Sequence, residues 1–284
     1  MQRKQIAIIT GSTGGIGSAI ADQLAGAGCH LVLVNRNAKK AEAQKAKLQA
    51  SHNGAEVDIV TADLMDIAQI KEAAQTVVGM YPNVDLLFNN SGVLTSERVM
   101  SAQEHESNYA INTLAAYVMT KGLRPALRTQ ELGAKSMIVN TTSSAQNSAK
   151  SLDTTMLSDP KNVGGLTGAY ATTKLALTTM GTAMATELEA EGIKIRSVCP
   201  GAVVTPMTKT SDAMPGILKL LVPILFKSPE KQAAKMIHAA RVDSYGGKTG
   251  IYITNGREKP VPNLAKDPDV QAKLMAKLSE DAGV

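Results

Sequence analysis

The sequence predicts a doubly wound α/β fold, in which a parallel sheet of about seven strands carries helices on both faces. Short apolar runs alternate with longer segments of helical periodicity, and this alternation is typical of a parallel sheet. The runs are continuously apolar, as expected for strands buried on both faces. A glycine-rich segment, residues 11–17, follows the first run. No internal repeat or low-complexity linker divides the chain, so we expect residues 1–284 to form a single domain.

The boundaries of the elements follow from these runs. Strands are expected at residues 5–9, 30–34, 56–61, 86–89, 136–140, 194–199 and 249–253. Helices are expected at residues 16–27, 67–80, 102–123 and 169–191. A further helix is expected between the second strand and about residue 50. Residues 258–284 are expected to form a C-terminal tail.

Two long segments, residues 145–168 and 204–228, interrupt the alternation. Both follow the carboxyl ends of strands, where ligands bind in open α/β sheets, and long loops in compact domains are usually functional or disordered. The second segment contains the apolar run 217–226. We expect it to act as a lid over a substrate; a subunit interface and a membrane-surface contact are the alternatives.

Composition excludes several classes of function. The net charge is +5, but basic residues are scattered, and Arg3-Lys4 and Lys39-Lys40 are the only obvious pairs. Nucleic-acid binding is therefore not expected. Two cysteines are too few for a disulfide framework, and no apolar stretch is long enough to span a bilayer. A strand pattern begins by Ile6 and leaves no room for a secretion signal, so we expect a cytoplasmic protein.

Two kinds of catalysis find no support in the sequence. The four histidines are scattered without ligand spacing, so no metal site is predicted. A Gly-x-Ser-x-Gly turn is absent, so acyl transfer is not supported.

The glycine-rich segment suggests a phosphate-binding turn. Gly11, Gly15 and Gly17 are spaced as Gly-x-x-x-Gly-x-Gly, which differs from the Gly-x-Gly-x-x-Gly fingerprint. Glycines at this position permit a tight turn and a close approach of the backbone to a pyrophosphate, and the following helix presents free N–H groups. A plain glycine-rich connector is the alternative.

The residues after the second strand indicate which dinucleotide is bound. An acidic residue there would bond the ribose 2′-hydroxyl of NAD, whereas an arginine accommodates a 2′-phosphate. The chain has Asn35-Arg36, which favours NADP(H) over NAD(H), and Ser12 could add a hydroxyl to the same phosphate. An exposed loop cation is the alternative for Arg36.

Two more turns follow strands. Asp63, next to Leu64, follows the third strand; its carboxylate could accept a hydrogen bond from an adenine amino group, or it could cap a helix. Asn89-Asn90-Ser91-Gly92 follows the fourth strand. This segment is either a plain turn or a place where the backbone presses against the cofactor.

Tyr170 and Lys174 supply a candidate proton-transfer pair. They are four residues apart in a predicted helix, so they share one face. A lysine ammonium beside a phenol favours the phenolate and is expected to lower the tyrosine pKa. Such a phenol can act as an acid toward a carbonyl or as a base toward an alcohol. Alone, most Tyr-x-x-x-Lys pairs are ordinary helix surface.

Taken together in this order, the motifs resemble the short-chain dehydrogenase/reductase family over nearly the whole chain. The matching segments are residues 10–17, Asp63-Leu64, residues 89–92 with Ser91 in place of Ala, Asn112 within residues 109–112, residues 138–143, Tyr170 with Lys174, and residues 200–205. The resemblance implies a Rossmann-type fold and a catalytic set of Asn112, Ser143, Tyr170 and Lys174. The cofactor-binding residues that it implies are Gly11, Ser12, Thr13, Gly15, Ile16, Gly17, Asn35, Arg36, Asp63, Leu64, Asn90, Ser91, Gly92, Tyr170, Lys174, Pro200, Gly201, Val203 and Thr205.

The chain departs from the family pattern before the tyrosine. Ser143 precedes Tyr170 by 27 residues, where the family usually has about a dozen, and Ser144 is the alternative catalytic serine. The extra residues resemble an insertion in the retinol dehydrogenase-like and protochlorophyllide reductase-like branches, as do residues 228–234 and 250–252.

The family resemblance also implies an activity and an assembly. We expect an NADP(H)-dependent oxidoreductase that acts on a carbonyl or alcohol substrate, and lipophilic molecules are among the substrates expected. An NAD-dependent alcohol dehydrogenase of the same family, a cofactor-sensing binding protein without chemistry, and an interaction module are the alternatives. A homodimer or homotetramer is implied, assembled through the helices expected at residues 102–123 and 169–191.

Overall fold

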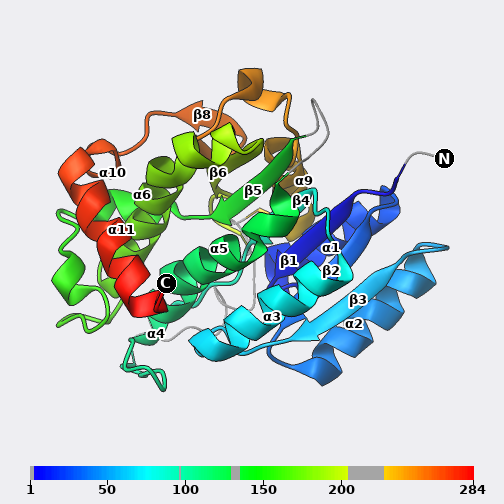
Figure 1. Ribbon diagram of the computed structural model, residues 1–284, viewed down its shortest axis with the longest axis horizontal. Coiled ribbons are helices and arrows are strands. Elements are labelled where there is room, and N and C mark those ends of the chain that lie inside the picture. The colour runs from blue at the N-terminus through cyan, green and yellow to red at the C-terminus, as the bar shows by residue number, and fades with distance from the viewer. Residues whose placement is uncertain (1–2, 96, 129–134, 204–226) are drawn as a thin grey trace.

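The computed structural model describes residues 3–95, 97–128, 135–203 and 227–284, and an eight-stranded sheet runs through their centre (Figure 1). The strand order is β3-β2-β1-β4-β5-β6-β7-β8. The strands are β1 Ile6–Thr10, β2 His30–Asn35, β3 Val57–Thr61, β4 Leu86–Asn89, β5 Ser136–Thr141, β6 Ile193–Cys199, β7 Ile251–Thr254 and β8 Arg257–Lys259. The order reverses between β1 and β4, which opens a crevice beyond their carboxyl ends.

The seven predicted strands are confirmed, and they pair in parallel. The eighth, β8, pairs antiparallel with β7 and was not predicted, because its three residues are exposed and carry no apolar run. Asn255 and Gly256 join the two strands, both with positive φ. An Asn-Gly pair is the strongest short hairpin signal, so the sequence did contain evidence for this turn.

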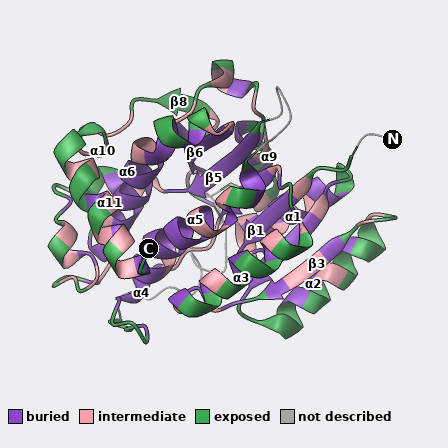
Figure 2. Ribbon diagram, in the orientation of Figure 1, coloured by how far each residue is buried: buried purple, intermediate pink, exposed green. Residues whose placement is uncertain are grey.

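Helices cover both faces of the sheet, and two apolar cores lie between them. The helices are α1 Gly15–Gly26, α2 Ala38–Ser51, α3 Ile67–Met80, α4 Ser107–Tyr109, α5 Ala115–Leu127, α6 Ala169–Ala190, α9 Pro229–Ala240, α10 Asn263–Lys266 and α11 Pro268–Ala282. One core packs α3, α5 and α6 against the sheet, and the other packs α1 and α9. Figure 2 shows the central strands β1, β5 and β6 as buried, as their continuously apolar sequences predict.

The helix predicted at residues 102–123 is divided and shifted. Residues 101–106 lie outside the helix, and Glu106 caps α4 by accepting a hydrogen bond from Asn108 N. A π-helical turn, η1 (Ala110–Leu114), joins α4 to α5. Such turns are rare and occur often at functional sites. Periodicity alone does not reveal this one, because a single extra residue hardly changes the apolar pattern.

The long segment 145–168 contains two short 3₁₀ turns, η2 (Ser144–Ser148) and η3 (Thr154–Met156). Most of the predicted lid lies outside the described residues, including Thr205 and the apolar run 217–226.

The segment expected to be a C-terminal tail forms secondary structure and packs against the rest of the fold. It contributes β8, α10 and α11, and α11 lies over α6 (Figure 1). Leu274, Leu278 and Ala282 are buried on one face of α11, at the spacing that an amphipathic helix requires. The charged residues between them concealed this pattern.

Candidate active site

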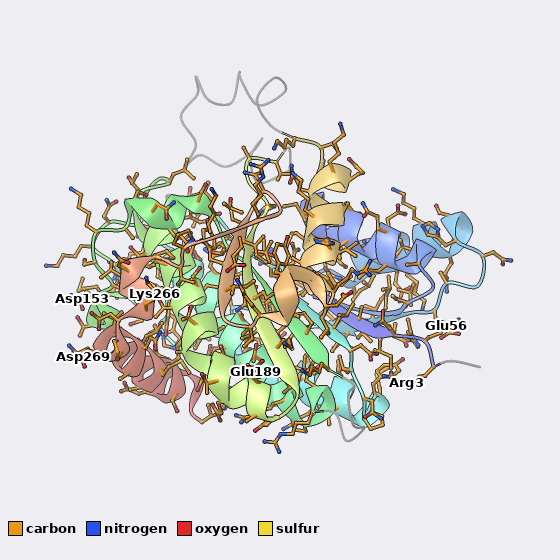
Figure 3. All side chains as sticks on the ribbon, turned by 90° about the horizontal axis from the view of Figure 1, so that it is seen from above. Arg3, Glu56, Asp153, Glu189, Lys266 and Asp269 are labelled. Carbon is orange, nitrogen blue, oxygen red and sulfur yellow. The ribbon has the colours of Figure 1, made fainter. Side chains whose placement is uncertain are left out.

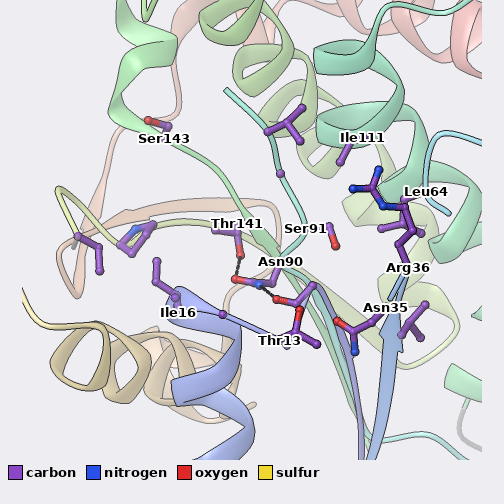
Figure 4. A pocket seen from close by; sticks show the side chains of 18 of the residues that line it. Thr13, Ile16, Asn35, Arg36, Leu64, Asn90, Ser91, Ile111, Thr141 and Ser143 are labelled. Carbon is purple, nitrogen blue, oxygen red and sulfur yellow. Dashed lines mark hydrogen bonds between the residues drawn. The ribbon is translucent and has the colours of Figure 1, made fainter. Parts of the chain in front are cut away.

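A cavity of about 510 Å³ opens beyond the carboxyl ends of β1, β4 and β5 (Figure 4). Most of the residues predicted to bind a cofactor line it. They are Gly11, Thr13, Gly15, Ile16, Asn35, Arg36, Asp63, Leu64, Asn90, Ser91, Gly92, Tyr170, Lys174, Pro200, Gly201 and Val203. In Figure 4, Arg36 and Leu64 lie well apart from Ser143, with Asn90 and Ser91 between them.

The glycine-rich turn fits an anionic group. Gly11 and Gly15 have positive φ, and Gly14 begins α1 without a side-chain cap. The first turn of α1 holds no acidic residue, so its free N–H groups and positive dipole end can face a phosphate. A Cβ on Gly17 would lie 2.3 Å from Gly11 O. The glycine therefore allows α1 to pack tightly against the turn, although Gly17 itself does not line the cavity.

Thr10 and Asn90 hold this turn to the end of β4. Asn90 Nδ2 donates to Thr10 O and Gly11 O, at 3.1 and 3.3 Å. Thr10 Oγ1 accepts from Asn90 N and Ser91 N, each at 3.0 Å. The backbone at residues 90–92 therefore forms one wall of the cavity. The turn after β4 therefore borders the space where the sequence places the cofactor.

Ser12 does not have its predicted place. Its side chain is fully buried, donates to Gln44 Oε1 at 3.0 Å and accepts from Asn35 Nδ2 at 2.8 Å. A hydroxyl with both partners inside the protein is not available to a 2′-phosphate. Lys40 instead lines the cavity together with Arg36. The sequence analysis noted Lys40 only as half of a basic pair; its position four residues after Arg36 was the available signal.

Arg36 reaches toward Asp63 at this end of the cavity. Arg36 Nη1 lies 3.8 Å from Asp63 Oδ2, and 71% of the Arg36 side chain is exposed. Asp63 Oδ1 accepts from Met65 N at 3.0 Å. The helix cap of α3 is Asp66, whose carboxylate accepts from Ala68 N, so the helix-cap alternative for Asp63 is wrong.

Tyr170 and Lys174 enter the cavity from the first turns of α6. Lys174 Nζ lies 5.8 Å from the centre of the Tyr170 ring and donates to Thr141 O, at the end of β5, at 2.9 Å. Lys174 is 3% exposed. Its charge is therefore held by the backbone of a neighbouring strand and has no carboxylate partner within the described residues.

Asn112 lies in the π turn, behind the cavity wall. Its Oδ1 accepts from Val93 N at 2.8 Å, and its Nδ2 donates to Val93 O at 3.0 Å and Thr173 Oγ1 at 3.3 Å. A Cβ on Gly92 would lie 3.0 Å from Asn112 Oδ1 and 3.2 Å from Lys174 Nζ. The glycine thus lets the chain pass between these two side chains. Asn112 is 1% exposed and does not line the cavity.

Ser143 is the serine that lies beside the tyrosine. It lines the cavity, accepts from Ala145 N at 3.2 Å, and is close enough to the Tyr170 phenol to favour its ionised form. Ser144 does not line the cavity; its backbone N–H donates to Cys199 Sγ at 3.1 Å. The 27-residue separation therefore does not keep Ser143 from Tyr170, because the extra residues fold outside the site.

The pKa of the tyrosine differs from the expectation. Burial raises the pKa of Tyr170 to about 12, with the Ser143 hydroxyl opposing the rise. Burial also lowers the pKa of Lys174 to about 8. The expected lowering of the tyrosine pKa by the lysine is therefore not seen, because desolvation by burial is the largest influence on the phenol.

The described residues lack two other kinds of feature. No helix in the described ranges is long and apolar enough to cross a membrane. Within the same ranges, no group of three His, Cys, Asp or Glu side chains is arranged to hold a metal ion.

Comparison with known proteins identifies a family. Residues 5–216 match the model of the short chain dehydrogenases. The chain is 29% identical to human polyprenol dehydrogenase, covering 99% of this chain and 86% of that protein. It is 28% identical to a chloroplastic short-chain dehydrogenase of Brassica napus (94% and 85% covered) and 26% identical to human retinol dehydrogenase 13 (98% and 84% covered).

Solved structures share the fold. A putative uncharacterized protein from Mycobacterium paratuberculosis has a TM-score of 0.75 at 20% identity, covering 99% of this chain and 94% of that chain. A 3-ketoacyl-(acyl-carrier-protein) reductase from Brucella melitensis, complexed with NADH, has a TM-score of 0.68 at 22% identity, covering 89% of this chain and 98% of that chain.

Proposed function

The chain belongs to the short-chain dehydrogenase family, in which it is a nicotinamide-dependent oxidoreductase, and we propose that its cofactor is NADP(H) and its substrate a lipophilic carbonyl or alcohol. One observation carries the proposal. Tyr170, Ser143 and Lys174 line the same cavity as Arg36 and Lys40. The same cavity therefore contains a candidate proton-transfer pair and two cations suited to binding a phosphate.

The protein groups divide the work of proton transfer. Tyr170 exchanges a proton with the substrate oxygen, and Ser143 donates a hydrogen bond to that oxygen. Lys174 stabilises negative charge on the tyrosine oxygen when the phenol loses its proton. Asn112 keeps the cavity wall at Val93 in place through its two hydrogen bonds. When bound, the nicotinamide supplies or accepts the hydride.

The charge at the other end of the cavity supports NADP(H) over NAD(H). Arg36 and Lys40 are both basic and both line the cavity, and a 2′-phosphate would offer them an anionic partner. Asp63 is the one nearby carboxylate among the lining residues, and Arg36 lies beside it. An NAD-dependent enzyme would favour an acid free to bond the ribose, so NAD(H) is the second candidate.

The relatives support a lipophilic substrate. Polyprenol dehydrogenase and retinol dehydrogenase are named for apolar alcohols, and the sequence has an apolar run at residues 217–226 that could cover such a molecule. A cofactor-sensing protein without chemistry is disfavoured, because it would need no Tyr170, Ser143 and Lys174 together.

The assembly and the compartment belong to the same proposal. We propose a homodimer or homotetramer of single-domain chains in the cytoplasm. The helices α5 and α6 are largely buried by α3, α10 and α11, so the subunit contact would use other surfaces. Light scattering at several protein concentrations tests the assembly.

The function is tested by thermal stabilisation and then by turnover. A ligand that binds only the native state raises the melting temperature, and at equal concentration the ligand with the lower Kd raises it more. NADPH is expected to raise it more than NADH at equal concentration, and a panel of apolar aldehydes, ketones and alcohols is expected to yield a substrate. Equal increases in melting temperature with NADPH and NADH would contradict the role of Arg36. Cofactor binding without turnover of any member of the substrate panel would favour the cofactor-sensing alternative.

A further inference from the structure

We propose that the C-terminal helix α11 holds the π turn that carries Asn112, through a hydrogen bond between Asp281 and Tyr109, and that Asp281 is a positioning residue of the active site. The role in turnover rests on the function proposed above; the role in holding the turn does not.

The helix lies against the elements that build the site. It contacts α6, η1 and η3, and α6 carries Tyr170 and Lys174, while η1 carries Asn112. Figure 3 shows Lys266 and Asp269, which flank the start of α11, at the same end of the molecule as Asp153, which caps η3. The last 17 residues of the chain therefore lie next to the elements that carry Tyr170, Lys174 and Asn112.

One polar contact joins α11 to the start of the π turn. Tyr109 Oη donates to Asp281 Oδ2 at 2.7 Å. Tyr109 is fully buried, and 6% of the Asp281 side chain is exposed. The other oxygen, Asp281 Oδ1, accepts from Lys277 Nζ at 2.7 Å. Burial and the carboxylate raise the pKa of Tyr109, so the phenol keeps its proton and acts as the donor.

The remaining contacts hold the opposite side of the same turn. Thr113 Oγ1 donates to Thr173 O at 2.8 Å, and Asn112 bonds Val93 and Thr173. The turn is thus fixed to α6 and the cavity wall on one side and to α11 on the other. A π turn is less favourable than regular helix, so the loss of one of these attachments is expected to let it relax.

Relaxation of the turn predicts a specific kinetic result. Asn112 would shift against the chain at Gly92, where an added Cβ would lie 3.0 Å from Asn112 Oδ1, and small misplacements of catalytic groups cost large factors in rate. Arg36 and Lys40 lie at the start of α2, whereas α11 packs against α6, η1 and η3, so the affinity for the cofactor should be kept. A loss in kcat without a change in cofactor affinity separates positioning from a general loss of stability.

The experiment compares four variants of the full chain. Tyr109→Phe and Asp281→Ala remove the bond, Asp281→Asn keeps an acceptor oxygen for the phenol, and Lys277→Met removes only the other partner of the carboxylate. Two readouts test the proposal: hydrogen exchange of the amides of residues 109–114, and kcat. The melting temperature and the Kd of NADPH are measured on the same variants.

The first two variants are expected to exchange faster in residues 109–114 and to lose about 10-fold in kcat, with the Kd of NADPH unchanged. Asp281→Asn and Lys277→Met are expected to retain both exchange protection and kcat. If Tyr109→Phe, which removes a single oxygen, folds normally with wild-type exchange in these residues, the proposal is overturned. An inactive wild-type protein would refute the proposed function, whereas the exchange data would still decide whether α11 holds the turn.

Discussion

Lys174 Nζ donates a hydrogen bond to the carbonyl oxygen of Thr141 at 2.9 Å. This contact joins the second turn of α6 to the last residue of β5, two residues before Ser143. It therefore fixes the helix that carries Tyr170 against the strand that leads to the serine. The candidate catalytic groups come from distant parts of the chain and are brought together by contacts of this kind between a side chain and the backbone.

The two adjacent serines are expected to differ in function. Ser143 lines the cavity beside Tyr170, whereas Ser144 does not line it. Ser143→Ala should lower kcat by about 10²-fold, because removing a donor to a developing oxyanion typically costs this much. Ser144→Ala is the matched control and should lower it less than about 3-fold, since its backbone bond to Cys199 survives. Equal losses of kcat in the two variants would contradict the assignment of Ser143 as the serine that bonds the substrate oxygen.

Arg36 and Lys40 are expected to set cofactor preference. Arg36→Ala and Lys40→Ala should each raise the Kd of NADPH by about 10-fold, because a charge-assisted hydrogen bond contributes about 1.5–3 kcal/mol. The Kd of NADH should change little, since it has no 2′-phosphate. Lys39→Ala is the control, because Lys39 is exposed and is not among the residues that line the cavity. Fluorescence titration with both cofactors measures the difference.

The pH dependence of carbonyl reduction follows from Lys174. Its pKa is lowered to about 8 by burial, so its ammonium is present below pH 8 and is lost above it. Tyr170, with a pKa raised to about 12, stays protonated and available as an acid throughout this range. The ratio kcat/KM for reduction should therefore be level near pH 6–7 and fall with a midpoint near pH 8.

Lys174→Arg provides the control for this profile. A guanidinium keeps its charge at these pH values, so any residual activity of the variant should show no midpoint near pH 8. A wild-type rate that stays level to pH 9.5 would mean that the charge on Lys174 does not matter to reduction.

Glu191 is expected to stabilise the fold through two arginines. Arg124 and Arg128 both hydrogen-bond its carboxylate and lower its pKa from 4.5 to about 2. A lowered pKa stabilises the folded state above pH 4.5, and this contribution is lost as the pH falls toward 2. Glu191→Gln should lower the free energy of unfolding by about 2 kcal/mol at pH 7, and the difference from wild type should vanish near pH 2.

Glu187 offers the control for this network. Among the residues that the structure describes, it pairs with Arg124 alone, and 59% of its side chain is exposed, so Glu187→Gln should cost less than about 1 kcal/mol. Urea unfolding of the three proteins at pH 7, 4 and 2.5 gives the comparison. If the free energies of unfolding of wild type and Glu191→Gln differ by the same amount at all three pH values, the role of the Glu191 charge is contradicted.

The parts of the site that the sequence predicted are those with fixed local spacing. Tyr170 and Lys174 share a helix, and Gly11, Gly15 and Gly17 lie in one turn, so their arrangement follows from the chain itself. Ser12 was misplaced because its orientation depends on Gln44, which lies 32 residues away. The direction of the tyrosine pKa shift was predicted wrongly because burial, its largest cause, is a property of the whole fold.

Long-range contacts account for what the sequence analysis missed. The pairing of Tyr109 with Asp281 spans 172 residues, and no local pattern connects the two. The last helix lies in the segment that was expected to form a C-terminal tail, and its packing on α6 appears only in three dimensions.

The central claim is that Tyr170 transfers a proton to or from the substrate in an NADP(H)-dependent reaction. The most direct test is Tyr170→Phe, with kcat and the Kd of NADPH measured on the same preparation. We predict that kcat falls by about 10²–10⁴-fold, because the variant lacks the general acid, and that the Kd of NADPH stays within about 2-fold of wild type. Near-wild-type turnover by Tyr170→Phe would contradict the account.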